Sequence, residues 1–230
     1  MSTIISGLGM GPGDPELVTL KALRILRAAD VVAYPKPENG QSFVRSIAAP
    51  HLSGEQEELE ISVPMVPADR FPANGVYDRA AEEIASHANV GKRIAVLCEG
   101  DPFFYGSFMH LFTRLAERFE VEVVPGVSSL AAGAAALRLP LAERNEAITI
   151  LPAPLDEEVL EARLAAAEVA VIVKVGRHLA KVRRVIERLG LTARAHYIER
   201  ASLPAERTAP LAEVNDETAP YFSLIYVIRS

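Results

Sequence analysis

Residues 7–14 read Gly-Leu-Gly-Met-Gly-Pro-Gly-Asp, a glycine-rich stretch that joins an apolar run at 3–8 to a segment with helical periodicity at 15–29. Apolar side chains recur along one face of that segment, and Asp14 precedes a proline, which is the pattern of an N-cap followed by the first helical residue. A second apolar run at 30–34 predicts another strand. The chain therefore begins as a β-α-β unit, with the glycine-rich stretch as its first strand-to-helix turn.

The alternation of strand and helix continues along the chain. We predict further helices over 42–48, 76–88, 107–117, 128–137, 157–167 and 179–189, and further strands over 60–63, 93–98, 121–124, 147–151, 169–175, 195–198 and 221–228. Such alternation predicts an α/β fold. We place a boundary between two α/β domains near Pro125, so that residues 1–124 form the first domain and residues 125–230 the second.

The composition and charge restrict which partners, metal sites and cellular locations are expected for the chain. The chain has 230 residues, 50% hydrophobic and 23% charged, which is typical of a globular protein. Its net charge of −6 opposes nucleic acid or an anionic membrane as the main partner. Cys98 is the single cysteine and the 5 histidines are scattered, so we predict no metal site and expect Cys98 to be a buried strand residue, not a nucleophile. With no signal-peptide pattern and no long apolar run, we expect a cytoplasmic protein.

Three predicted strands end in glycine-containing turns that lead into helices. The turns are residues 7–14, 99–102 and 125–129. In an open α/β sheet, ligands bind outside the carboxyl ends of the strands, where such turns lie. We therefore predict that these three loops form the binding site.

The first loop does not fit the common nucleotide motifs. In G-x-G-x-x-G the third glycine would fall on Pro12 or on Asp14, and no acidic residue for a ribose ends the second strand. A P-loop is absent because Gly91-Lys92 continues with an arginine. Capping alone explains Asp14, but so many glycines indicate close approach of the backbone to a ligand.

The other two loops leave alternatives open. The aromatic run Phe103-Phe104-Tyr105 either walls a flat ligand or packs at the start of a helix, and packing is the better reading for Phe103 alone. Ser128 and Ser129 either donate hydrogen bonds to a ligand or cap the helix that follows.

Taken together, residues 7–26, 98–111 and 124–130 resemble the tetrapyrrole methylase family, the S-adenosylmethionine-dependent enzymes that methylate uroporphyrinogen and precorrin carbons. Within the family, residues 34–36, the Gly40-x-Ser42 step and above all residues 99–109 look like the branch that methylates precorrin-2 at carbon 20. Uroporphyrinogen methylases usually have Gly-Gly-Asp-Pro where this chain has Glu-Gly-Asp-Pro, which favours the carbon-20 branch.

The resemblance implies a homodimer of two α/β domains, with the ligand cleft between them and no metal required by the protein. The first domain would carry the tetrapyrrole-facing glycine loop, and the second would share the S-adenosylmethionine site. The implied donor contacts are Pro12, Glu99, Gly100, Asp101, Phe104, Ser128, Ser129, Val175 and Ala209, the last by a loose alignment.

The acceptor carries many carboxylates, so its site should contain local positive charge. Our candidates for contact with the acceptor are Gly11, Gly13, Lys36, Lys174 and Arg177, although each charged one could equally be a solvated surface group. As catalytic candidates we name Asp14, which would bind pyrrole N–H groups or accept the released proton, and Tyr105.

The implied activity is methylation of precorrin-2 to precorrin-3A in cobalamin and porphyrin biosynthesis. The alternatives are the cobalt-precorrin-2 enzyme of the anaerobic route, a related tetrapyrrole C-methyltransferase, and a silent protein that only binds the tetrapyrrole or the donor. A related fold methylates ribosomal RNA, but the acidic balance and the lack of a basic, aromatic-interleaved stretch oppose RNA as the partner.

Overall fold

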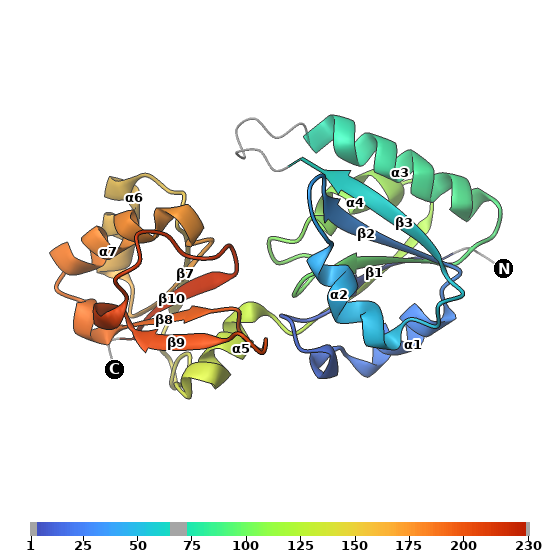
Figure 1. Ribbon diagram of the computed structural model, residues 1–230. Helices are drawn as coiled ribbons and strands as arrows, with labels where there is room; N and C mark the ends of the chain where they lie inside the picture. Colours follow the sequence, from blue (N-terminus) through green and yellow to red (C-terminus); the bar gives the residue numbers. More distant parts are fainter. Residues whose placement is uncertain (1–3, 65–72, 229–230) are drawn as a thin grey trace. The chain divides into compact units, whose positions relative to one another are not determined.

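The computed structural model describes residues 4–64 and 73–228. The chain divides into two compact units, Met1–Ser128 and Ser129–Ser230, so the division falls a few residues beyond the boundary expected near Pro125. Each unit is an α/β layer structure with one five-stranded sheet in its described part (Figure 1). None of the described helices is long and apolar enough to cross a membrane.

The first unit holds a parallel sheet in the order β3-β2-β4-β1-β5. Its strands are β1 (Ile4–Gly9), β2 (Val31–Pro37), β3 (Glu57–Val63), β4 (Ile94–Cys98) and β5 (Glu120–Val124), and its helices are α1 (Leu20–Ala28), α2 (Phe43–Ala48), α3 (Ala73–Asn89) and α4 (Phe108–Leu115). One face of the sheet packs on α3 and α4 and the other on α1 and α2. Every residue of the central strand β4 is buried.

The glycine-rich turn does not lead into one continuous helix over 15–29, as predicted. A 3-10 helix occupies Pro15–Leu17, the backbone is extended at Val18, and α1 begins only at Leu20. The break forms because the Thr19 hydroxyl accepts the N–H of Ala22 at 3.2 Å and starts a second helix. The apolar periodicity hid this break, because Val18 still packs against the core.

The second unit holds a mixed sheet in the order β6-β7-β10-β8-β9. Its strands are β6 (Ile148–Pro152), β7 (Val169–Val173), β8 (Ala195–Glu199), β9 (Arg207–Pro210) and β10 (Ser223–Ile228), and its helices are α5 (Ser129–Leu137), α6 (Glu157–Ala166) and α7 (Leu179–Arg188). The last strand, β10, lies in the sheet interior and runs antiparallel to both of its neighbours. The strand predicted over 221–228 is confirmed, and its residues Ser223–Val227 are buried.

Two differences from the predicted elements in this unit have local causes. The edge strand β9 was not predicted, because its four residues are largely exposed and end in proline. Strand β7 stops at Val173 rather than at residue 175, because Lys174 turns into the left-handed region with φ 59°.

Helix α5 packs so closely on β10 that a side chain at Gly133 would collide with Tyr226. A Cβ built at Gly133 lies 2.2 Å from the Tyr226 hydroxyl oxygen, and that hydroxyl donates to the Leu130 carbonyl at 2.9 Å. We expect Gly133→Ala to lower the free energy of unfolding by about 1–3 kcal/mol, the usual cost of an overpacked core. Chemical denaturation measures the change.

Gly75 in α3 provides the matched control, because a Cβ there meets only the end of the flexible Arg79 side chain at 3.7 Å. Gly75→Ala should leave stability unchanged or raise it by up to about 1 kcal/mol, the helix propensity difference between the two residues. Equal unfolding free energies for the two variants would contradict the close packing of α5.

Candidate active site

The three predicted loops meet at the carboxyl edge of the first sheet. They follow β1, β4 and β5, and β1 pairs in parallel with both β4 and β5. The first two loops are joined by an antiparallel bridge, in which the Gly100 N–H donates to the Gly11 carbonyl at 2.8 Å and the Gly11 N–H donates to the Gly100 carbonyl at 3.3 Å. The Met10 N–H adds a bond to the Cys98 carbonyl at 2.9 Å. We call this three-loop arrangement the glycine clasp.

The third loop joins the clasp by direct backbone packing. A Cβ built at Gly9 would lie 2.4 Å from the Gly126 nitrogen, and one built at Gly126 would lie 2.0 Å from the Gly100 carbonyl oxygen. Real Cβ atoms do not come so close, so these positions accept only glycine. The glycine excess at 7–14 was interpreted as close approach to a ligand, whereas at Gly9 the close neighbour is the third loop itself.

The Asp101 carboxylate ties the second loop to the third. Oδ2 accepts the Gly126 N–H at 3.1 Å, and Oδ1 accepts the Phe103 N–H at 2.9 Å. Both carboxylate oxygens are therefore occupied by backbone donors. Asp101 was predicted as a donor contact, and the structure gives its side chain an organising role within the clasp.

Two further acidic positions of the loops differ in their surroundings. Asp14 accepts the Glu16 N–H at 2.8 Å and caps the short helix that follows, as the capping interpretation predicted. Glu99 directly follows β4 and is partly buried, and this burial raises the pKa of its carboxyl group. The catalytic role of Asp14 stays a prediction.

The thiol of Cys98 is buried at the end of strand β4. It is 1% exposed, and burial raises its pKa to about 12. Since the thiolate is the nucleophile and a thiol with this pKa stays protonated at neutral pH, Cys98 is not a nucleophile. The sequence-based prediction of a buried strand residue is confirmed.

The aromatic run of the second loop divides into packed and exposed rings. Phe103 contacts Phe112 edge-on, with ring centroids 5.1 Å apart, and this is the packing predicted for it. Tyr105 is 47% exposed and contacts Phe104 edge-on at 5.0 Å. Tyr105 also has φ 56°, a conformation that is uncommon in residues with a side chain and costs energy.

The predicted acceptor cations have different environments. Lys36 in β2 donates to Glu60 at 2.6 Å, so a carboxylate of its own unit already balances its charge. Lys174 and Arg177 are exposed in the turn that follows β7. Pro12 and Gly13 lie in the first loop, next to the bridge at Gly11. Contact of any of these residues with a substrate stays a prediction.

The predicted donor residues of the second unit are only partly brought together. Val175 is fully buried beside the carboxyl end of β7, where the Gly176 carbonyl accepts the Ala219 N–H at 3.0 Å. Ala209 lies on the edge strand β9, and β10 and β8 intervene between β9 and β7 in the sheet. Ser129 is the first residue of α5, and Ser128, the last residue of the first unit, precedes it in the N-cap position.

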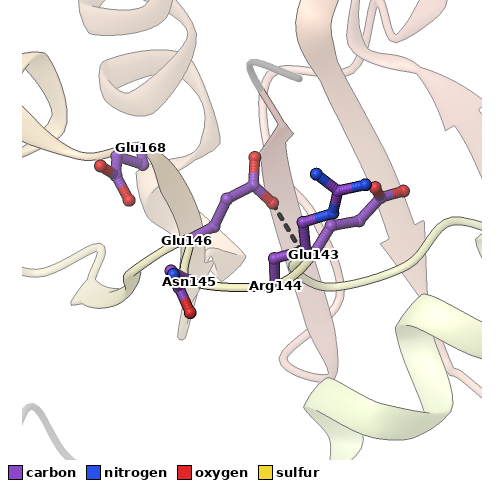
Figure 2. A pocket seen from close by; sticks show the side chains of 5 residues that line it. All are labelled: Glu143, Arg144, Asn145, Glu146 and Glu168. Carbon is purple, nitrogen blue, oxygen red and sulfur yellow. Dashed lines mark hydrogen bonds between the residues drawn. The ribbon is translucent and has the colours of Figure 1, made fainter.

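A shallow pocket of the second unit lies at the amino ends of the parallel strands β6 and β7, whereas Val175 lies at the carboxyl end of β7. Figure 2 shows its lining residues Glu143, Arg144, Asn145, Glu146 and Glu168. Two of its carboxylates are bound to backbone N–H groups, Glu146 to that of Glu143 at 2.7 Å and Glu168 to that of Ala147 at 2.6 Å. No group of three or more His, Cys, Asp or Glu within 4–64 and 73–228 is placed to hold a metal ion. The pocket is structural in character, and the carboxyl edge of the first unit remains the candidate site.

Comparison with known proteins gives this site a family context. The family model of the tetrapyrrole (corrin/porphyrin) methylases matches residues 5–215. Precorrin-2 C(20)-methyltransferase of a Sinorhizobium species is 41% identical, over 96% of this chain and 93% of that protein. Cobalamin biosynthesis protein CobIJ of Mycobacterium tuberculosis is 44% identical over 95% of this chain, but the chain spans only 44% of the length of that protein.

A solved structure shares the fold. Uroporphyrin-III C-methyl transferase from Thermus thermophilus, complexed with S-adenyl homocysteine, superposes with a TM-score of 0.69 and 28% sequence identity, covering 96% of each chain. The predicted fold class, an α/β fold of the tetrapyrrole methylase type with two sheets, is confirmed. The predicted ligand cleft stays a prediction.

Proposed function

The chain belongs to the tetrapyrrole (corrin/porphyrin) methylase family, and from this premise we propose that it transfers the methyl group of S-adenosylmethionine to carbon 20 of precorrin-2, giving precorrin-3A in cobalamin biosynthesis. The structural observation that carries the proposal is the glycine clasp at the carboxyl edge of the first sheet. The acceptor is inferred from the Sinorhizobium relative and from residues 99–109, which resemble the carbon-20 branch.

The charge of the clasp suits the methyl donor. Residues 7–14, 98–107 and 124–128 contain three acids and no Lys, Arg or His. S-adenosylmethionine carries a positive sulfonium, which such a surface attracts. We propose that the donor binds here, with Pro12, Glu99, Gly100, Asp101, Phe104, Ser128, Ser129, Val175 and Ala209 as its contact residues.

Methyl transfer from S-adenosylmethionine depends mainly on how the donor and the acceptor are oriented. The sulfonium is already an activated leaving group, so the acceptor carbon displaces it in line with little acid or base help. Holding the two reacting carbons in position can supply roughly 7–11 kcal/mol of the barrier reduction. A rigid backbone clasp serves this purpose better than mobile side chains. Lys174 and Arg177 would hold acceptor carboxylates, and Tyr105 would contact the macrocycle.

An anaerobic incubation tests this function. The protein is mixed with methyl-labelled S-adenosylmethionine and, in separate reactions, with precorrin-2, cobalt-precorrin-2 or uroporphyrinogen III, and the products are analysed by mass and by the position of the label. We expect one added methyl, at carbon 20 of precorrin-2. Preference for the cobalt complex would assign the anaerobic route. Donor binding without transfer to any acceptor would contradict the proposal and favour a silent binding protein.

We also propose that the protein is a cytoplasmic homodimer, as in the family that its sequence resembles. Light scattering on the purified protein tests the oligomeric state directly: the expected mass is twice the 24.9 kDa of the chain.

A further inference from the structure

The three acids of the clasp are not equivalent. The carboxylate of Asp14 accepts the Glu16 N–H and caps a helix, and both oxygens of Asp101 accept N–H groups of the second and third loops. Within the described residues, no other residue forms a hydrogen bond or an ion pair with the Glu99 carboxyl group. Glu99 is therefore the acid of the clasp that the fold leaves available to a ligand.

The position of Glu99 is fixed by its neighbours. The Cys98 carbonyl before it accepts the Met10 N–H at 2.9 Å, and the Gly100 N–H after it donates to the Gly11 carbonyl at 2.8 Å. The residues before and after Glu99 are thus both hydrogen-bonded to the first loop, residues 7–14, which fixes the backbone that carries the carboxyl group.

We propose that Glu99 is the base that accepts the proton lost by the methylated carbon, a role that rests on the proposed methyltransferase function. The new carbon–carbon bond forms as the bond between sulfur and the methyl group breaks, with its electron pair remaining on sulfur. The acceptor carbon then carries both the new methyl group and its original hydrogen. Breaking that carbon–hydrogen bond restores the double bond of the macrocycle, and the proton passes to the Glu99 carboxylate and on to water.

The electrostatic surroundings agree with this role. Burial raises the pKa of the Glu99 carboxyl group, and a base is most effective when its pKa lies close to the working pH. The other titratable groups of the three loops are Asp14, Cys98, Asp101 and Tyr105, and the loops contain no cation. The Glu99 carboxylate must be ionised to act, so the transfer rate should fall as the pH drops through its pKa. That fall should begin at a higher pH than for an ordinary glutamate.

The test compares Glu99→Gln with the wild type in single-turnover methyl transfer across pH. Glutamine keeps the shape but cannot accept a proton, so we expect the rate to fall roughly 100-fold or more, as for loss of a general base, and the acidic limb of the pH profile to disappear. Glu99→Asp should restore part of the rate. The control is Glu117→Gln, which changes an exposed carboxylate and should leave both rate and profile unchanged.

Two further readouts separate this role from others. Calorimetric titration with S-adenosylhomocysteine should give a similar affinity for Glu99→Gln and wild type, because glutamine keeps a side-chain oxygen for the proposed donor contact. Carboxyl NMR should show one glutamate with a raised pKa that is missing in the variant. Weaker binding with an unchanged saturated rate would overturn the role as base and leave Glu99 only its proposed donor contact. A wild-type rate and profile in Glu99→Gln would also overturn it. If the wild type methylates no tetrapyrrole, the proposed function fails, and this role fails with it.

Discussion

Gly126→Ala is expected to weaken the binding of S-adenosylhomocysteine at least tenfold and to destabilise the first unit. The added Cβ would lie 2.0 Å from the Gly100 carbonyl oxygen and 2.8 Å from backbone atoms of Gly9. Backbone atoms on two sides cannot move aside as a flexible side chain would, so the third loop must leave the clasp. We expect a loss of about 1–3 kcal/mol in the free energy of unfolding and at least a tenfold loss of donor affinity.

Gly100→Ala is the control within the same clasp. A Cβ there meets no atom within 4 Å, but φ is +60°, so the substitution introduces left-handed strain without a collision. It should cost about 1 kcal/mol and weaken donor binding less than Gly126→Ala does. Calorimetric titration of both variants, each first shown to be folded by circular dichroism, gives the comparison. Tight donor binding by Gly126→Ala would contradict the clasp as the donor site.

Asp101→Ala is expected to weaken donor binding by at least tenfold while the protein still folds. The substitution removes the acceptor of the Gly126 N–H and of the Phe103 N–H, and hydrogen bonds to a charged group contribute about 1.5–3 kcal/mol each. Asp101→Asn keeps one acceptor oxygen and should have an intermediate effect. The measurement is donor affinity together with the free energy of unfolding.

Asp30 provides a matched control at the amino ends of the strands of the same sheet, away from the glycine clasp at their carboxyl ends. Its carboxylate also accepts a backbone N–H, that of Arg93 at 2.8 Å, and pairs with the Arg93 guanidinium at 2.9 Å. Asp30→Ala should therefore lower stability while leaving donor affinity unchanged. If both aspartate variants reduce affinity in proportion to stability alone, Asp101 has no particular role in the donor site.

Much of the fold follows from local patterns in the sequence. Apolar runs and helical periodicity predicted nine of the strands and all seven α-helices of the described residues to within a few residues, because each element buries one side against a sheet. The break between the 3-10 helix Pro15–Leu17 and α1 was missed. Asp14 and Thr19 each cap a separate helix, but the apolar side chains keep the spacing of one continuous helix. The strand β9 was missed because an edge strand has one ladder partner and little burial to mark it.

The candidate site was predictable in position but not in its internal contacts. Glycines that follow parallel strands indicate a binding edge, and the three loops do meet there. Which glycine touches which loop depends on strand order, so the contact of Gly9 with Gly126 could not be read from the sequence. The pairing of Lys36 with Glu60 was hidden for the same reason, because it needs the parallel register of β2 and β3.

Hydrogen exchange of the backbone amides, with and without saturating S-adenosylhomocysteine, tests most directly where the donor binds. We predict that the ligand protects amides in residues 9–14, 99–106 and 126–128. Slower exchange confined to the second unit's pocket at residues 143–146 and 168, or no change in the three loops at saturation, would contradict the glycine clasp as the donor site.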